Sequence, residues 1–163
     1  MVTSPIAADR TSRPLDRDDI ERLIAIDRAH GGHSRRHFFE KRFAAAKAQP
    51  DDFINLGVVE DGRLRGFASA RVHRGEFGSE RAVAILDAIG VESESRERGI
   101  GQMLVRELGK TMGRRSVRAL QTQAGWTNHE LLRFFATAGF KLAPRLALER
   151  PVAVPLDETT EEI

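Results

Sequence analysis

The chain of 163 residues contains no cysteine, which excludes disulfides, thiolate zinc sites and thiol nucleophiles. No stretch approaches the roughly 18 consecutive apolar residues of a membrane-spanning helix, and the N-terminus lacks the apolar segment of a secretory signal. Zinc-finger, basic-zipper and RNA-binding aromatic motifs are also missing. We therefore expect a cytoplasmic protein of one domain, without a metal ion, a membrane partner or a nucleic-acid partner.

The formal net charge is only +2, so there is no general excess of one sign. Positive charge is nevertheless concentrated in one segment, where only Glu97 and Glu107 oppose Arg96, Arg98, Arg106, Lys110, Arg114, Arg115 and Arg118. A basic segment beside a glycine-rich loop favours a small polyanionic ligand. For the residues after Arg106, a solvated helix surface is the better interpretation.

Hydrophobic periodicity predicts one mixed α/β domain at residues 11–153, between a loose tail at 1–10 and an acidic tail at 154–163. Helical spacing and end signals predict helices at 16–31, 34–49, 100–112 and 128–138. Apolar runs predict strands at 53–60, 63–73, 81–91, 117–124 and 145–152. The strand at 81–91 is apolar on both faces, so we expect it in the centre of the sheet.

Short local signals mark several turns and helix ends. Asp61-Gly62 predicts a hairpin between the first two of these strands. Asp16 is the expected N-cap of the first helix. Thr127 and Glu130 have the spacing of a capping box before the last helix, which should end at Gly139 as its C′ residue.

A glycine-rich loop, Arg96-x-x-Gly99-x-Gly101, lies between a predicted strand and a predicted helix. It is not a Walker A loop, because Gln102 follows Gly101 where that loop has lysine. It is not a dinucleotide fingerprint either, because the third glycine is replaced by Leu104. Free amides at a helix N-terminus favour an anion, and glycines let it approach. Close packing between elements is the alternative use of these glycines.

A second block of sequence follows this loop. Residues 128–140 read NHELLRFFATAGF, and residues 89–104 read IGVESESRERGIGQML. Together, in this order, the two blocks resemble the GNAT superfamily of acyl-CoA-dependent N-acyltransferases. The resemblance is close over residues 80–150, while the first half agrees only in the order of its elements. It implies an α/β fold with one central, mostly antiparallel sheet that splays at the cofactor site and is flanked by helices.

The resemblance also implies acetyl-CoA as the acyl donor. The pyrophosphate would rest on the amides of residues 98–102, and the pantetheine arm would pair with the strand end at 89–91. A backbone N–H near Val91 would polarise the thioester carbonyl. The implied cofactor-binding residues are Ile89, Gly90, Val91, Arg96, Arg98, Gly99, Ile100, Gly101, Gln102, Asn128 and Phe135.

Two positions depart from the family pattern. Many members have a tyrosine that protonates the leaving sulfur, and that position is Phe135 in a chain without any tyrosine. Some protein N-terminal acetyltransferases have a glutamate where this chain has Gln123. Because a thiol has a pKa of about 8.5, the sulfur can still leave as an anion near neutral pH. Losing the general acid then lowers the rate on the order of 100-fold. We hypothesise either a base that acts through water or a weakly basic acceptor such as an arylamine.

Candidate bases lie near the predicted thioester position. Burial would raise the pKa of Asp87 and suit it as a base, with structural pairing as the alternative. By simple alternation, Asp87 shares one strand face with Val83, Ile85, Ile89 and Val91. Glu92, at the strand exit, is a second candidate and is expected to be more exposed.

Three histidines, His30, His33 and His37, lie in the segment where this family builds its acceptor pocket. They indicate a metal only weakly, because no third ligand is evident. A polar loop is the main interpretation, with His33 or His37 contacting the acceptor as the alternative.

The sequence thus predicts an N-acetyltransferase in which an amine attacks the thioester directly. Its acceptor is a protein lysine, a protein N-terminus or a small amine. One alternative is an acyl-CoA-binding sensor or interaction module without turnover, and another is a phosphate-binding domain unrelated to CoA. A homodimer is expected by family analogy alone.

Overall fold

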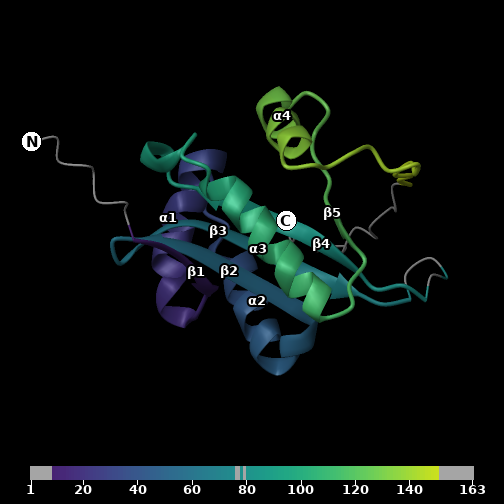
Figure 1. The fold of residues 1–163 in the computed structure, drawn as a ribbon, viewed down its shortest axis with the longest axis horizontal. Helices are drawn as coiled ribbons and strands as arrows, with labels where there is room; N and C mark the ends of the chain where they lie inside the picture. The colour runs from purple at the N-terminus through teal and green to yellow at the C-terminus, as the bar shows by residue number, and fades with distance from the viewer. Residues whose placement is uncertain (1–8, 76–77, 79, 151–163) are drawn as a thin grey trace, which may run out of the picture.

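The computed structural model describes residues 9–75, 78 and 80–150. One five-stranded sheet, in the order β1-β2-β3-β4-β5, separates two layers of helices. Figure 1 shows α3 across one face of the sheet, with α1 and α2 on the other. The elements are β1 (Arg10–Pro14), α1 (Ile20–Gly31), α2 (Arg36–Ala48), β2 (Phe53–Glu60), β3 (Arg63–His73), β4 (Val83–Val91), α3 (Ile100–Arg114), β5 (Ala119–Gln121) and α4 (His129–Thr137).

The sheet is mixed, which confirms the predicted α/β class. Strands β1 to β4 pair antiparallel, and β5 pairs with β4 in parallel. The predicted hairpin joins β2 to β3 through Asp61 and Gly62, whose φ angles of 51° and 73° are both left-handed, as a type I′ turn requires. The central position predicted for β4 is also confirmed, since it lies between β3 and β5.

Each face of the sheet covers its own apolar core. On one face α3 buries Ile100, Leu104 and Leu108 against β2, β3 and β4, with the period predicted from the sequence. On the other face Phe39 of α2 lies edge-on to Phe67 of β3, with ring centroids 5.5 Å apart. The first core also receives α4, so the two blocks that carry the family resemblance pack together.

A β-bulge in β4 moves the side chains after it to the opposite face. The register with β3 slips between Leu86 and Ala88, which leaves Asp87 as the extra residue. Leu86 packs in the α3 core and Ala88 in the α1–α2 core, although alternation would place them together. Ile89 consequently packs on the α3 side, whereas Asp87 pairs with Arg42 of α2. The shared face predicted for Asp87 and Ile89 is wrong, because alternation does not survive a bulge.

The helix ends follow their sequence signals, with one shift. Asp16 caps a 3-10 turn at Arg17–Asp19 that leads into α1. Asn128, and not Thr127, is the N-cap of α4, because its Oδ1 accepts the amide three residues further on at 3.1 Å. Gly139 ends α4 with a left-handed φ of 87°, as predicted for a C′ glycine.

The last predicted strand, 145–152, is wrong over its described residues, which form neither helix nor strand. Leu146 and Leu148 are 88% and 92% exposed. Apolar alternation favours a strand only where a neighbouring backbone supplies hydrogen bonds, and no strand lies beside residues 145–150 among those described.

Other predicted element boundaries differ less from the observed ones. Strand β5 covers only Ala119–Gln121 of the predicted 117–124, and β1 begins at Arg10, the last residue of the predicted tail. Residues 1–8 and the acidic tail at 154–163 lie outside the described residues, so those assignments stay predictions. In the described part of the chain, no helix combines the length and apolarity needed to cross a bilayer.

Candidate functional site

Strands β4 and β5 diverge after a short pairing. Residues 83–85 of β4 pair with β5, and Thr122 Oγ1 donates a further hydrogen bond to the Leu86 carbonyl at 3.1 Å. Beyond that point, residues 87–91 face no strand on this edge among the described elements. The sheet therefore splays, as the family resemblance implied, and leaves a strip of strand backbone open.

The open edge presents amide hydrogens. The Val91 amide donates to Nε2 of His30, from the last turn of α1, at 3.4 Å. Because backbone directions alternate along a strand, the Ile89 amide points to the same side. An extended ligand lying along this edge would meet both amides.

The loop that follows presents further amides at the start of α3. Gly99 precedes the helix, and the Met103 amide donates to the Gly99 carbonyl at 3.0 Å. Across the described chain, the amides of residues 98–102 find no acceptor in hydrogen-bonding geometry. The positive end of the α3 dipole lies at the same place, so the loop suits an anion.

The two loop glycines serve different purposes. A Cβ on Gly101 would lie 2.7 Å from Cε2 of Phe134, so this glycine lets α4 pack directly on α3. A Cβ on Gly99 would meet no heavy atom within 4 Å, and this glycine instead supplies a left-handed φ of 78°. The packing interpretation therefore applies to Gly101, while Gly99 sets the turn that exposes the amides.

A buried glutamate holds the loop from behind. Glu60, at the end of β2, is 1% exposed and accepts hydrogen bonds from Arg10 at 2.8 Å and from Arg98 at 3.0 Å. Arg10 also donates to the Arg98 carbonyl at 2.8 Å. The Arg10 hydrogen bond, with support from the Arg98 charge, holds the pKa of Glu60 below its ordinary value of 4.5 although burial acts in the opposite direction. The Arg98 side chain is thus committed to the scaffold, and its amide remains open.

Arg96 is held far more loosely. Its nearest carboxylate is Glu130 of α4 at 3.7 Å, and the Glu130 side chain is 86% exposed. An exposed pair at this distance contributes little to stability. Of the two arginines in the loop, Arg96 is the one whose charge is available to an anion.

Glu92 lies directly after β4 and is buried, which corrects the expected exposure. Its carboxylate pairs with Arg65 at 2.7 Å, with Arg63 at 2.9 Å and with Arg22. Burial alone would raise the pKa of Glu92, but hydrogen bonds from Arg65 and Arg22 hold it below its ordinary value of 4.5. A carboxylate stabilised in this way is a weak proton acceptor.

Asp87 is also paired. Its carboxylate lies 2.9 Å from Arg71 of β3 and 2.9 Å from Arg42 of α2, with only 10% of the side chain exposed. These contacts fit the structural alternative considered for Asp87. They also direct the side chain toward α2, away from the core that Ile89 faces.

His30 is the titratable side chain at the open edge. Partial burial of the ring and the nearby Arg96 charge hold the pKa of His30 below its ordinary value of 6.5, against the opposing carboxylates of Asp27 and Glu130. The sequence placed His30 near the acceptor segment but gave no sign of its contact with Val91, because contacts between distant elements leave no local pattern. Within the described residues, no three His, Asp or Glu side chains are grouped so as to hold a metal ion.

The α4 block supplies a cap and a core residue. Asn128 uses its Oδ1 as the α4 cap, and its side-chain nitrogen bonds no described residue. Phe135, at the family's tyrosine position, is 6% exposed, and its ring centroid lies 4.9 Å from that of Phe140. Phe135 is therefore a packed core residue that has no hydroxyl to donate.

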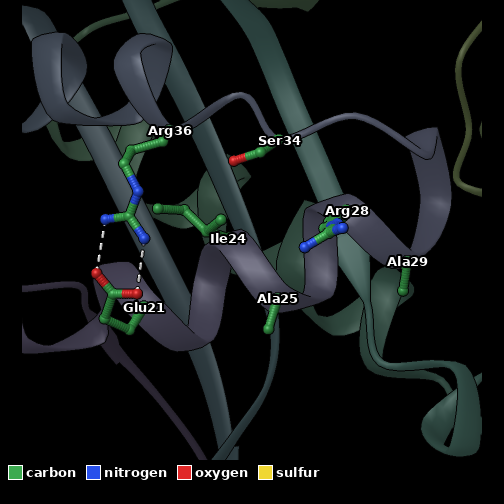
Figure 2. Close-up of a pocket in the computed structure, with 7 residues that line it drawn as sticks. All are labelled: Glu21, Ile24, Ala25, Arg28, Ala29, Ser34 and Arg36. Carbon is green, nitrogen blue, oxygen red and sulfur yellow. Dashed lines mark hydrogen bonds and ion pairs between the residues drawn. The ribbon is translucent and has the colours of Figure 1, made fainter.

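A shallow groove of about 580 Å³ lies apart from these residues, on the outer side of α1. Figure 2 shows Arg36 and Glu21 facing each other there, joined by hydrogen bonds of 2.6 and 2.8 Å. No predicted cofactor-binding residue lines this groove, whose residues are Glu21, Ile24, Ala25, Arg28, Ala29, Ser34 and Arg36.

Comparison with known proteins agrees with this geometry. The profile of the Acetyltransferase (GNAT) family matches residues 18–140, whereas no curated protein matches the chain significantly. Aminoglycoside N-acetyltransferase AAC(6')-Iy, solved in complex with CoA, superposes with a TM-score of 0.74 at 17% identity, covering 93% of this chain and 100% of that one.

Two further solved structures show the same fold. Aminoglycoside antibiotic 6'-N-acetyltransferase AAC(6')-IG from Acinetobacter haemolyticus has a TM-score of 0.73 at 15% identity, covering 88% of this chain and 99% of that one. Glucosamine-6-phosphate N-acetyltransferase from Arabidopsis thaliana has a TM-score of 0.66 at 15% identity, with coverages of 86% and 97%.

Proposed function

The chain belongs to the acetyltransferase (GNAT) family, and from this premise we propose that it transfers the acetyl group of acetyl-CoA to the nitrogen of a small amine. One observation carries the proposal. The amides of residues 98–102, which lack acceptors among the described residues, follow the unpaired β4 edge at 87–91 after one short turn. One end of the sheet thus offers an anion site beside an extended backbone site, which suits a diphosphate followed by an amide-containing arm.

The residues present fit acetyl-CoA. The amides of residues 98–102 would hold the pyrophosphate, and Arg96 would add charge to it. The backbone of residues 89–91 would pair with the pantetheine arm, and Asn128 would donate its free side-chain nitrogen. We assign Arg98, which pairs with Glu60, to loop positioning.

The chain contributes chiefly position and polarisation. Bound acetyl-CoA would supply an activated thioester. An amide on the open edge, near Val91, would stabilise negative charge on the thioester oxygen. Holding the acceptor close to the carbonyl carbon supplies most of the remaining rate enhancement. Phe135 supplies no proton, so the sulfur leaves as a thiolate, which its pKa of about 8.5 permits near neutral pH.

We propose scaffold roles for both carboxylates predicted as bases. Asp87 links β4 to α2 through Arg42, and Glu92 anchors the loop entry through Arg65. Another group must therefore remove the proton from the acceptor amine.

A small amine is the acceptor class that the solved relatives favour, since those compared act on aminoglycosides or on glucosamine 6-phosphate. Protein acceptors, a homodimer and the cytoplasmic compartment stay predictions. The rival function is an acyl-CoA-binding module without turnover, which the core position of Phe135 and the glutamine at 123 favour.

Thiol release from acetyl-CoA tests the proposal. The purified protein is mixed with acetyl-CoA and one of four probes: sisomicin, glucosamine 6-phosphate, a lysine-containing peptide or 4-aminobenzoate. Calorimetry with CoA is run in parallel. We expect CoA binding and release of thiol that depends on at least one amine. Binding without any amine-dependent release would establish the rival, and no heat at millimolar CoA would refute both.

A further inference from the structure

The His30 side chain contacts the backbone of the open β4 edge. Its Nε2 accepts the Val91 amide at 3.4 Å, which is long for a hydrogen bond. The ring stands at the exposed C-terminal end of α1, so an acceptor molecule can reach it. A ligand along this edge would take up the Val91 amide and release Nε2 beside the polarised carbonyl.

Three carboxylates near the site are already engaged in ion pairs. Asp27 pairs with Arg35, Glu92 with three arginines and Asp87 with two. The Nε2 of His30, by contrast, bonds only to a backbone amide among the described residues. A group that can take a proton without breaking an ion pair is the better base.

We propose that His30 is the general base of acetyl transfer, an inference that rests on the function proposed above. Nε2 of His30 takes one proton from the acceptor's ammonium group, and the freed nitrogen lone pair attacks the thioester carbon. The C–N bond forms, the C–S bond breaks and its electron pair leaves with sulfur. A second proton from the attacking nitrogen passes to that sulfur, and His30 returns its proton to solvent.

The charges around the ring suit this role. Asp27 on α1 and Glu130 on α4 stabilise the protonated imidazole, and Arg96 in the loop opposes it. Because burial and Arg96 outweigh the carboxylates, the pKa of His30 stays below 6.5 and the ring is neutral at pH 7, ready to accept a proton. An alkylamine, with a pKa of about 10.4, needs such a base, whereas an arylamine is already neutral.

His30→Gln tests the role, with Arg28→Gln as the control from the same helix, because Arg28 is exposed and lines the groove that lies apart from the site. For an alkylamine acceptor we expect kcat of H30Q to fall on the order of 100-fold or more at pH 7. We expect the KM for acetyl-CoA, the Kd for CoA and the Tm of H30Q to stay near wild type, and R28Q to stay within about twofold throughout. Transfer to 4-aminobenzoate should fall much less, and added imidazole should partly rescue His30→Ala.

A measurement without turnover supplements the kinetics. Nitrogen-detected NMR of the imidazole rings in the unliganded protein should show Nε2 of His30 unprotonated at pH 7 and a pKa below 6.5. The kcat/KM profile of wild type should rise through a matching pKa, and H30Q should lose that rise.

Three results would overturn the assignment. Turnover by wild type with H30Q within about twofold of it would reject His30 while leaving the acetyltransferase function intact. A protonated Nε2 at pH 7 would also reject it, even if H30Q failed to fold. CoA binding without turnover by wild type would reject the acetyltransferase function, and the role of His30 with it.

Discussion

Replacing Gly101 with alanine tests why a side-chain-free residue stands in the first turn of α3. The added Cβ would lie 2.7 Å from Cε2 and 3.1 Å from Cζ of Phe134. The first distance is closer than real Cβ contacts, so the ring or the whole of α4 must move. The Phe134 ring cannot move freely, because its centroid lies 5.4 Å from that of Phe135 in the core.

The expected cost follows from two opposing effects. Overpacking of this kind costs about 1–3 kcal/mol, while exchanging glycine for alanine in a helix returns up to about 1 kcal/mol. We therefore expect Gly101→Ala to lower the free energy of unfolding by about 1–2 kcal/mol. For a chain of this size that lowers the Tm by about 2–8 °C.

Gly109→Ala is the matched control, because Gly109 lies in the same helix and its added Cβ would meet nothing within 4 Å. Urea unfolding of this variant should show a gain of about 0.5–1 kcal/mol. The two variants must therefore change stability in opposite directions. If Gly101→Ala also stabilised the protein, the contact between Gly101 and Phe134 would be refuted. Phe134→Leu should restore part of the loss when it is combined with Gly101→Ala.

Three further substitutions probe the site. Arg10 and Arg98 hold the pKa of Glu60 below 4.5, so their ion pairs stabilise the folded state fully above pH 4.5 and lose this effect as the pH falls below it. The urea midpoint of wild type should therefore drop below pH 4.5, and that of Glu60→Gln should drop less steeply. Phe135→Tyr should lower stability by about 1–3 kcal/mol by burying a hydroxyl, without faster thiol release; a faster rate would contradict the core position. Arg96→Ala should weaken CoA binding about tenfold with stability nearly unchanged, and unaltered heats in calorimetry would remove Arg96 from the phosphate site.

Elements with a strong local signature could be predicted from the sequence. The hairpin turn at Asp61-Gly62 could be predicted, because a type I′ turn needs a positive φ at both positions and Asp-Gly adopts these angles at low cost. Gly139 ends α4 for the same reason. The residues that α3 buries in the core, Ile100, Leu104 and Leu108, followed from helical periodicity alone. These features depend on a few neighbouring residues, so a single sequence contains what is needed to find them.

Features that depend on distant partners could not be found in this way. The bulge at Asp87 is a property of two paired strands, and it moved Ile89 off the face that it was predicted to share with Asp87. Glu60 precedes a turn and would be expected at the surface, but Arg10 and Arg98 arrive from far along the chain and permit its burial. Residues 145–150 alternate like a strand, yet no described backbone pairs with them.

Ion pairs at both ends of the loop at residues 96–101 would leave its backbone amides as the main groups that bind a ligand. Arg65 lies 4.0 Å from Glu60 and 2.7 Å from Glu92, so a single chain of ion pairs holds the loop at both of its ends. The loop amides are thus fixed before any ligand arrives, whereas ordering flexible side chains on binding would cost about 0.5–1.5 kcal/mol each. Amides fixed in this way would hold the pyrophosphate of the proposed acetyl-CoA without rearranging, and they would do so independently of any tyrosine. Under the proposed function, phenylalanine at position 135 therefore removes proton donation and leaves the positioning of acetyl-CoA by the loop in place.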